Sequence, residues 1–200
     1  MRTFNHLILA FFLVLTGCTS VEPRVAKTQL PDGTFGYIAG EFKHDERELY
    51  ALSLLNINTD TNYLMASGSP AKKIKMGFAS EIVMIKVPPG LYEIKYWVQI
   101  DRSGIGPIGS RARFKKDSII AQQFKVTENS VIYLGNIEFT QERVPGGSME
   151  TVKLQRLSSA SAEIKFLEAF LAFANLSFSC PFCAVPLQDP KVPLKRLNPT

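Results

Sequence analysis

Histidine is scarce: the 200 residues include 2 histidines, and only His44 lies beyond the apolar N-terminal segment. A Ser-His-Asp or Cys-His arrangement would have to use His44. This residue stands in the charged run KHDERE, which is typical of a solvated turn. The neighbouring carboxylates of Asp45, Glu46 and Glu48 are expected to face water as well. The sequence therefore predicts no catalytic residues and no enzymatic activity.

Cysteine is also rare, with Cys18, Cys180 and Cys183 as its three positions. A structural zinc site needs four ligands in tetrahedral geometry. The close pair Cys180 and Cys183 could supply two, and His44 is the one histidine left to join them. We therefore predict no metal site and no bound cofactor.

The N-terminal apolar run, residues 7–15, is well short of the ~20 residues that a membrane-spanning helix needs. It follows Arg2 and leads into small residues before Cys18, a pattern typical of a secretory signal peptide. Residues 1–17 are therefore predicted to be a signal peptide. Cleavage at another position and an uncleaved anchor remain as alternatives.

The end of this segment, Leu15-Thr16-Gly17-Cys18, resembles the lipobox of bacterial lipoproteins. The resemblance implies cleavage before Cys18, a diacylglyceryl thioether on its sulfur, and an acyl chain such as palmitate on its new amino group. Several chains anchor firmly, because each buried CH₂ contributes about 0.8 kcal/mol. In that family an Asp after the cysteine favours retention at the inner membrane. Thr19 stands there, so the resemblance implies the cell outer membrane, facing the periplasm.

Removal of residues 1–17 leaves 183 of the 200 residues, enough for one domain with a substantial core. Residues 18–33 lack apolar periodicity and contain Pro23, Pro31 and Gly33, which predicts a flexible tether. The net charge of +5 falls to +4 once Arg2 is removed, which favours anionic neighbours such as lipid headgroups or acidic glycan. Export excludes nucleic acid as the partner.

Basic residues are densest in RSGIGPIGSRARFKK, residues 102–116. They are Arg102, Arg111, Arg113, Lys115 and Lys116. One interpretation is a solvated loop and strand edge, because Lys and Arg protect exposed sheet edges. The alternative is a site for lipopolysaccharide or peptidoglycan. The enclosed GIGPIG fits a dinucleotide-binding pattern, but Pro107 and the residues after it begin no helix. We interpret it as a flexible connection between strands.

The run VPPGLYEIKYWVQI, residues 87–100, alternates between two faces. Residues 92, 94, 96, 98 and 100 are apolar or aromatic and share one face, while Trp97 falls with polar residues on the other. Residues 81–87 are β-branched and apolar, so the two runs are predicted to form an antiparallel hairpin around Pro88-Pro89-Gly90.

Similar runs at 35–42, 49–57, 119–126, 131–139 and 150–157 are predicted to be strands, separated by turn-forming clusters. One cluster, Asn58 to Asn62, alternates like the start of a calcium loop, but Tyr63 stands where that loop needs glycine. It is better interpreted as a polar hairpin turn. The fold class is therefore mainly β, an antiparallel β-sandwich of about seven strands over residues 34–157.

The segments PPGLYEIKYW and FKVTENSVIYLGNIEF resemble the transthyretin-like or carboxypeptidase-regulatory-like β-sandwich domains of many envelope lipoproteins. In those domains a Pro-Gly turn opens a strand that carries a tyrosine. The likeness covers residues 34–157. It implies a β-sandwich that generally acts as a non-catalytic module, and it supplies no active site.

Residues 160–176, ASAEIKFLEAFLAFANL, change to a helical period, so 158–178 is predicted to be a packing helix. Its predicted apolar face contains Ile164, Leu167, Leu171 and Ala174, widened by Phe166, Phe170 and Phe173. This face is expected to close an open side of the sandwich, with docking on a partner or a membrane as the alternative. Residues 179–200 are predicted to be an extended, Pro-rich tail.

The tail begins with Cys180-Pro181-Phe182-Cys183, which resembles the active-site tetrapeptide of thioredoxin-like enzymes. In those enzymes a helix starts at the motif and its dipole lowers the pKa of the attacking cysteine. Here the cysteines follow a helix, and Pro186 prevents a long one from starting after them. A structural disulfide is therefore predicted. Thiol–disulfide exchange, metal binding and free thiols are the alternatives.

Together these features predict a lipid-anchored periplasmic protein that binds or supports an envelope protein or glycan without catalysis. Thiol–disulfide exchange through Cys180 and Cys183 is one alternative function. Binding of lipopolysaccharide or peptidoglycan by the basic 102–116 segment is another. The identity of the partner and the oligomeric state do not follow from the sequence.

Overall fold

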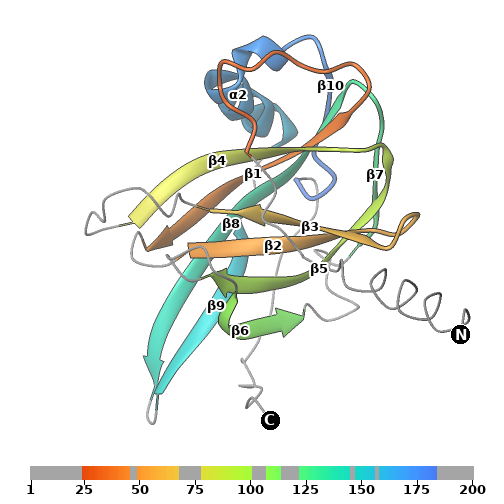
Figure 1. Cartoon of the computed structure of the whole chain (residues 1–200). Helices are drawn as coiled ribbons and strands as arrows, with labels where there is room; N and C mark the ends of the chain where they lie inside the picture. The colour runs from red at the N-terminus through yellow and green to blue at the C-terminus, as the bar shows by residue number, and fades with distance from the viewer. Residues whose placement is uncertain are drawn as a thin grey trace, which may run out of the picture.

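A computed structural model describes residues 24–45, 49–67, 78–100, 107–113, 122–144, 147–155 and 158–183 (Figure 1). The described chain is mainly β, with two five-stranded sheets and one α-helix. The first sheet contains β1 (Gly36–Asp45), β4 (Phe78–Val87), β8 (Ser130–Val144), β9 (Gly147–Gln155) and β10 (Ser177–Ser179). The second contains β2 (Leu49–Asn56), β3 (Thr61–Ala66), β5 (Gly90–Ile100), β6 (Pro107–Arg113) and β7 (Phe124–Val126).

All seven predicted strands have a counterpart, and the described residues contain three more: β3, β6 and β10. The Asn58–Asn62 cluster is a hairpin turn, as predicted, and β3 is its second strand, paired antiparallel to β2. Asp60 takes the left-handed conformation there, with φ of 53°. The GIGPIG segment is only partly a connection, because β6 begins at Pro107 and pairs with β5.

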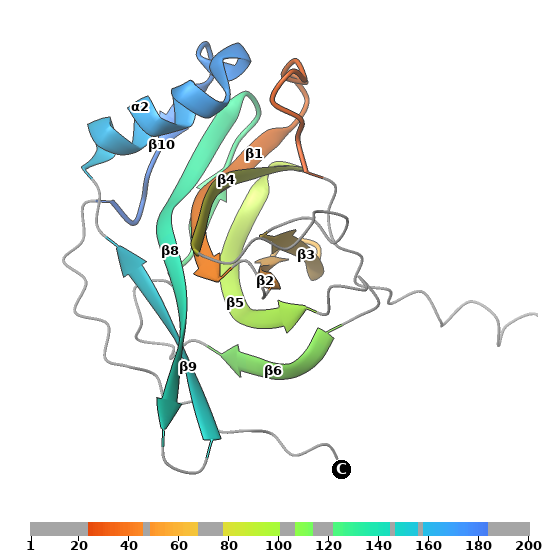
Figure 2. The same cartoon turned by 90° about the vertical axis from the view of Figure 1, so that its left-hand side faces the viewer.

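The sequence predicts antiparallel pairing throughout, but two strand pairs are parallel. β8 lies between β1 and β10 and runs parallel to both, whereas the other pairings are antiparallel. Parallel neighbours need a long connection between them. The chain between β1 and β8 contains β4 and all five strands of the second sheet. The helical segment connects β9 to β10 (Figure 2).

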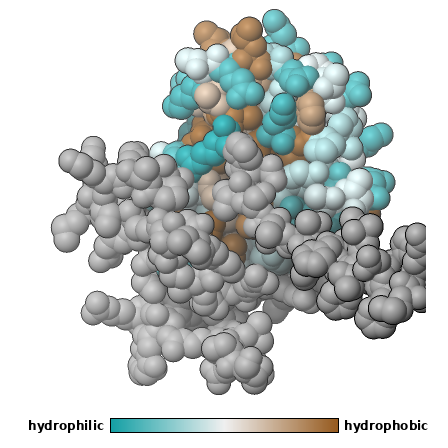
Figure 3. Space-filling view, in the orientation of Figure 1, coloured by the Kyte–Doolittle hydropathy of each residue, from teal (hydrophilic) through white to brown (hydrophobic). Residues whose placement is uncertain are grey.

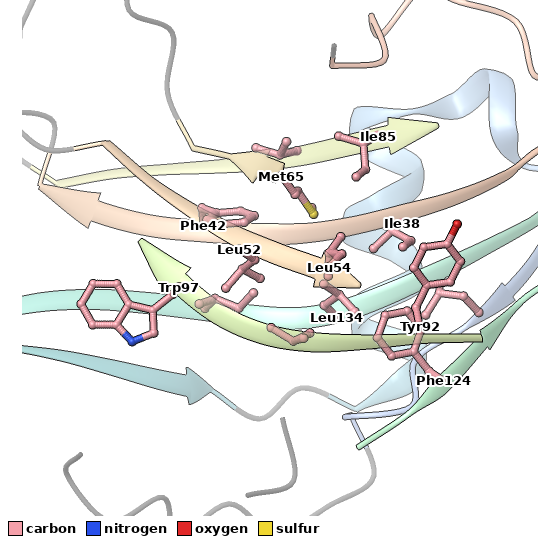
Figure 4. Packing of buried hydrophobic residues seen from close by; sticks show 14 of the residues in the cluster. Ile38, Phe42, Leu52, Leu54, Met65, Ile85, Tyr92, Trp97, Phe124 and Leu134 are labelled. Carbon is pink, nitrogen blue, oxygen red and sulfur yellow. The ribbon is translucent and has the colours of Figure 1, made fainter. Parts of the chain in front are cut away.

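The two sheets pack their inner faces around a common core (Figure 4). Phe139 of β8 stacks on Tyr50 of β2 with ring centroids 4.4 Å apart, and it also contacts Phe42 and Trp97. Each such aromatic pair contributes about 0.5–1.5 kcal/mol beyond the burial of its area. This aromatic group joins the two sheets.

The Pro88-Pro89-Gly90 turn does not close a hairpin, contrary to the prediction. β4, which precedes it, pairs with β1 in the first sheet, and β5, which follows it, pairs with β2 in the second. The prolines have no N–H to donate to a ladder, which suits the connection between the sheets. The buried Tyr92 hydroxyl donates to the carbonyl of Pro88 over 2.7 Å and fixes the corner.

The alternation predicted for β5 reverses at a β-bulge. The register against β2 shifts between Ser53 and Leu54, so Lys95 is the extra residue on β5. Tyr92 and Ile94 face the common core as predicted, but Trp97 also packs in it with 3% exposure. Val98 and Ile100 lie in a separate apolar cluster with residues of β2 and β3. A second bulge occurs in β8, where Gly135 has φ of 94°.

The predicted helix is shorter than 158–178. It comprises α2 (Ser159–Ala169), followed by the 3₁₀ turn η3 (Leu171–Phe173) and then β10. Ser158 caps α2, because its hydroxyl accepts a hydrogen bond from the backbone N–H of Ser161 over 3.1 Å. α2 covers the outer face of the first sheet, so the helix packs on its own domain (Figure 2).

The buried side of this segment matches the predicted face only in part. Phe166, Phe170 and Phe173 are buried against the first sheet, whereas Ile164 and Leu171 are 60% and 75% exposed. The three rings bury more apolar area than the aliphatic stripe would. Phe173 meets Tyr37 of β1 edge to face, with ring centroids 5.0 Å apart. The aromatic positions therefore determine which side of the helix faces the sheet.

Candidate functional site

An open groove of about 720 Å³ lies between three parts of the chain: the N-terminal segment Arg24–Lys27, the outer edge of β4, and the last turns of α2. Its apolar lining includes Val25, Ile82 and Phe170. Charged side chains of both signs stand around that lining. The visible surface of the described part is largely hydrophilic, with separate hydrophobic residues between the polar ones (Figure 3).

β4 is the last strand of the first sheet, and only part of its outer edge is covered. The backbone N–H of Val25 donates to the carbonyl of Met84 over 2.8 Å, and Arg24 forms an isolated bridge with Ile85. Backbone groups alternate in direction along a strand. Because the carbonyl of Met84 points away from β1, the N–H and C=O groups of Ile82 and Ser80 point away from it too. No strand of the described chain pairs with them.

Arg24 lines this groove and hydrogen-bonds to residues of two strands. Its guanidinium donates to both carboxylate oxygens of Glu81 over 3.1 Å and to the carbonyl of Ala66 over 2.8 Å. Ala66 ends β3 and Glu81 lies in β4, so one side chain connects the edge strands of the two sheets. The segment predicted as tether, 18–33, is therefore part of the folded body from Arg24 onward.

Glu41 of β1 connects the sheet to α2 at this groove. Its carboxylate accepts hydrogen bonds from the hydroxyl of Ser80 and from Nζ of Lys165, the latter over 2.9 Å. Burial raises the pKa of the neighbouring Tyr133 phenol well above its ordinary value, and the charge of Glu41 raises it further. Tyr133 is therefore neutral, and the Lys165–Glu41 ion pair is the charged contact between α2 and the sheet.

Two charges at the groove are available to a ligand. Lys27 and Glu168 both line it and are exposed, and neither forms an ion pair or a side-chain hydrogen bond with the described residues. Arg24 and Lys165, in contrast, are paired with carboxylates. Considering only the described residues, the groove therefore offers one cation and one anion without an ion-pair partner, and a strand edge without a neighbouring strand.

His44 does not lie in a solvated turn, contrary to the prediction. It is the penultimate residue of β1 and is 2% exposed. Its Nε2 lies 3.8 Å from Oε1 of Glu81, and its ring meets Tyr50 with centroids 6.3 Å apart. The burial follows from the length of β1, which extends through His44 and pairs with β4 there.

Cys180 and Cys183 form the predicted disulfide, with Cα atoms 5.4 Å apart. The backbone N–H of Cys183 donates to the carbonyl of Cys180, so the motif is a tight turn. Cys183 is 6% exposed, and Phe182 between them is buried in the common core against Phe124. Because Cys183 and Phe182 are both buried, this turn packs into the body of the domain.

Several predicted site residues are not brought to the groove. Cys18, Arg102, Lys115 and Lys116 lie outside the described residues, as do 184–200 of the predicted tail. The other two basic residues lie in β6, where Arg111 stands opposite Val98 and Arg113 opposite Tyr96.

The side chains at the groove support binding by hydrogen bonds and ion pairs. In the part of the chain that the structure describes, no three His, Cys, Asp or Glu residues group as metal ligands do. No helix in that part has the length and apolar character needed to cross a membrane.

Sequence reasoning missed the groove because its parts are far apart in the chain. Arg24 and Glu81 are 57 residues apart, and Lys165 is 124 residues from Glu41. A local signal did exist in β4, where Glu81 interrupts an apolar, β-branched run. A charge in such a run indicates a paired or functional residue.

Comparison with protein-family models, with curated proteins and with solved structures finds no match for this chain.

Proposed function

We propose that this chain is a lipid-anchored, non-enzymatic protein of the bacterial cell outer membrane that faces the periplasm and binds an envelope protein in the groove beside β4. The binding role rests on the groove, where the edge of β4 and the charges of Lys27 and Glu168 have no partner among the residues that the structure describes.

The anchoring role rests on the lipobox resemblance at Leu15–Cys18. Diacylglycerol on the sulfur of Cys18 and palmitate on its amino group would be the only covalent additions. Five residues, 19–23, separate Cys18 from Arg24, where the described body begins. Six steps of extended chain span about 20 Å. The lipid would therefore hold the groove close to the membrane surface.

Two sheets around a common core support assigning the body to the β-sandwich class, the architecture that the transthyretin-like resemblance implies. Such domains host unrelated functions, so the binding role is argued from the groove and not from the fold. The burial of Cys183 and of Phe182 beside it favours a structural role over thiol exchange.

The test is fractionation of a double-membraned bacterial host that produces the full chain. We expect the wild-type chain to pellet with outer membranes and to need detergent for release. The Cys18→Ser variant, which cannot form the thioether, is expected to leave that fraction. A Cys180→Ser/Cys183→Ser variant serves as the matched control and should remain in the membrane. Equal distribution of wild-type and Cys18→Ser chains would contradict the proposal.

A further inference from the structure

The unpaired edge of β4 has the properties of a strand-addition site. Ser80 and Ile82 direct their backbone N–H and C=O groups away from β1 and toward the groove, and no described strand covers them. An unpaired strand edge is a template for another extended chain. Two such residues, spaced by two along β4, can pair with one short extended segment.

The N-terminal segment of the described chain already pairs with another part of the same β4 edge. Arg24 and Val25 lie antiparallel to Ile85 and Met84, with one hydrogen bond of 2.8 Å. The backbone then turns away, since the N–H of Gln29 donates to the carbonyl of Ala26. The part of the edge beyond this turn is left to a second chain, which would continue in the direction of the N-terminal segment.

We propose that an extended segment of an envelope protein partner binds here by adding a strand, antiparallel to β4, next to Arg24–Ala26. Main-chain hydrogen bonds to Ser80 and Ile82 supply the pairing. Side chains on one face of the segment meet the partly exposed side chains of Ile82 and Ala169. A segment that carries both an acidic and a basic residue complements Lys27 and Glu168.

The composition of the groove favours such a partner over a second copy of this chain. In the symmetric register that pairs Ser80 with Ile82 of a second copy, Met84 of each copy would stand opposite Phe78 of the other. The outward carbonyl of Met84 already accepts a hydrogen bond from Val25 of its own chain, so this register is blocked beyond Ile82. Lys27 and Glu168, which have no ion-pair partner in the described part of the chain, instead suit a segment of mixed charge.

This inference deepens the proposed function, on which the assignment of the partner to the envelope rests. The pairing itself does not depend on lipid anchoring. A test with the purified full chain in detergent and a synthetic peptide therefore separates the two. Loss of membrane anchoring would leave the peptide result unchanged, and loss of peptide binding would leave the fractionation result unchanged.

The probe is a capped peptide of sequence Glu-Val-Thr-Val-Lys-Val, titrated while amide hydrogen exchange is followed by NMR. We expect binding to slow exchange at the amides of Ser80 and Ile82 at least tenfold. The amides of Glu81 and Val83, which point toward β1, report on the sheet itself and should change little. Absence of binding, or binding without slower exchange at Ser80 and Ile82, would overturn the inference.

Two matched variants test the pairing itself. Ile82→Pro removes the outward N–H, and proline is tolerated on an edge strand whose N–H faces away from the sheet. Ile82→Ala removes the side chain but keeps the N–H. We expect Ile82→Pro to bind the peptide about threefold to tenfold more weakly than Ile82→Ala, as for loss of one hydrogen bond. Equal affinities would overturn strand addition.

Light scattering on the same variants tests whether a second copy of this chain occupies the β4 edge. We expect Ile82→Pro and Ile82→Ala to have the same mass in solution. A dimer that Ile82→Pro abolishes and Ile82→Ala retains would assign the edge to self-association and overturn the peptide proposal.

Discussion

At the scale of single residues, Arg24 connects parts of the fold that are far apart in the sequence. It hydrogen-bonds to Glu81 in β4 and to the carbonyl of Ala66 in β3, which connects the edges of the two sheets. Its side chain is 32% exposed, so water screens part of the ion pair. The hydrogen bond to Ala66 adds a contact that salt does not remove.

Replacement of Arg24 by methionine is therefore expected to destabilise the fold. Methionine keeps apolar bulk but donates no hydrogen bond, so the free energy of unfolding should fall by about 1–2 kcal/mol. Urea unfolding followed by circular dichroism measures it. Lys27→Met is the control, since Lys27 contacts no charged partner among the described residues. If both variants unfold alike, Arg24 does not link the sheets.

At the scale of elements, α2 is held to the first sheet by aromatic side chains. Phe166 stacks on Phe170 with centroids 5.5 Å apart and also contacts Phe178 of β10. Ile164, two residues earlier, is 60% exposed. Phe166→Ala should lower the free energy of unfolding by about 3–5 kcal/mol. Ile164→Ala should change it by less than about 0.5 kcal/mol. The reverse order would mean that the predicted aliphatic face is the buried one.

The Cys180–Cys183 turn gives a second prediction for an element. On the chain-entropy model, a disulfide across so small a loop contributes about 2 kcal/mol. Phe182 fills a core position at 3% exposure, and Phe182→Ala should cost about 3–5 kcal/mol. Urea unfolding should therefore show a larger loss for Phe182→Ala than for the Cys180→Ser/Cys183→Ser variant. A larger loss for the serine variant would make the disulfide the dominant link.

At the scale of the whole molecule, stability should decline in alkaline solution. Burial raises the pKa of Tyr92 and of Tyr133 above the ordinary value of about 10. Above pH 10 the unfolded chain therefore loses tyrosine protons that the folded chain keeps, which favours unfolding as pH rises. At pH 11 the expected loss is about 1 kcal/mol per tyrosine relative to pH 9.

Urea titrations at pH 9 and pH 11 measure this decline. Tyr92→Phe and Tyr133→Phe remove the ionising group, so each should reduce the difference between the two pH values. Tyr92→Phe is also expected to lower stability at both pH values, because the hydroxyl hydrogen-bonds to Asn56 and Pro88. An unchanged pH difference in both variants would assign the alkaline effect to other groups.

The sequence predicted much of the fold because strand patterns are local. All seven predicted strands occur, and the helix begins within a residue or so of the predicted start. The pairing of strands was harder to predict. Pro88-Pro89-Gly90 is typical of a turn in either a hairpin or a crossover, and the two differ in the long-range pairing of β4 with β1 and of β5 with β2. The sequence around Lys95 likewise does not indicate a bulge. Strict alternation therefore predicts the polar face for Trp97, whereas its side chain lies in the common core.

The candidate site was less predictable than the fold. Its free edge exists because β4 ends a sheet, and the order of strands in a sheet depends on contacts between distant segments. Arg24 lies in a segment without apolar periodicity, a pattern that predicts a tether. Its role follows from Glu81 and Ala66, neither of which is near it in the chain.

The central claim is that a lipid on Cys18 holds this binding module on the membrane. Mass spectrometry of the full chain, extracted in detergent from the membranes of a double-membraned bacterial host, tests it most directly. The account predicts an N-terminal residue Cys18 that carries the mass of a diacylglyceryl group and an acyl chain. An N-terminus at another residue, or Cys18 with an unmodified thiol, would contradict it.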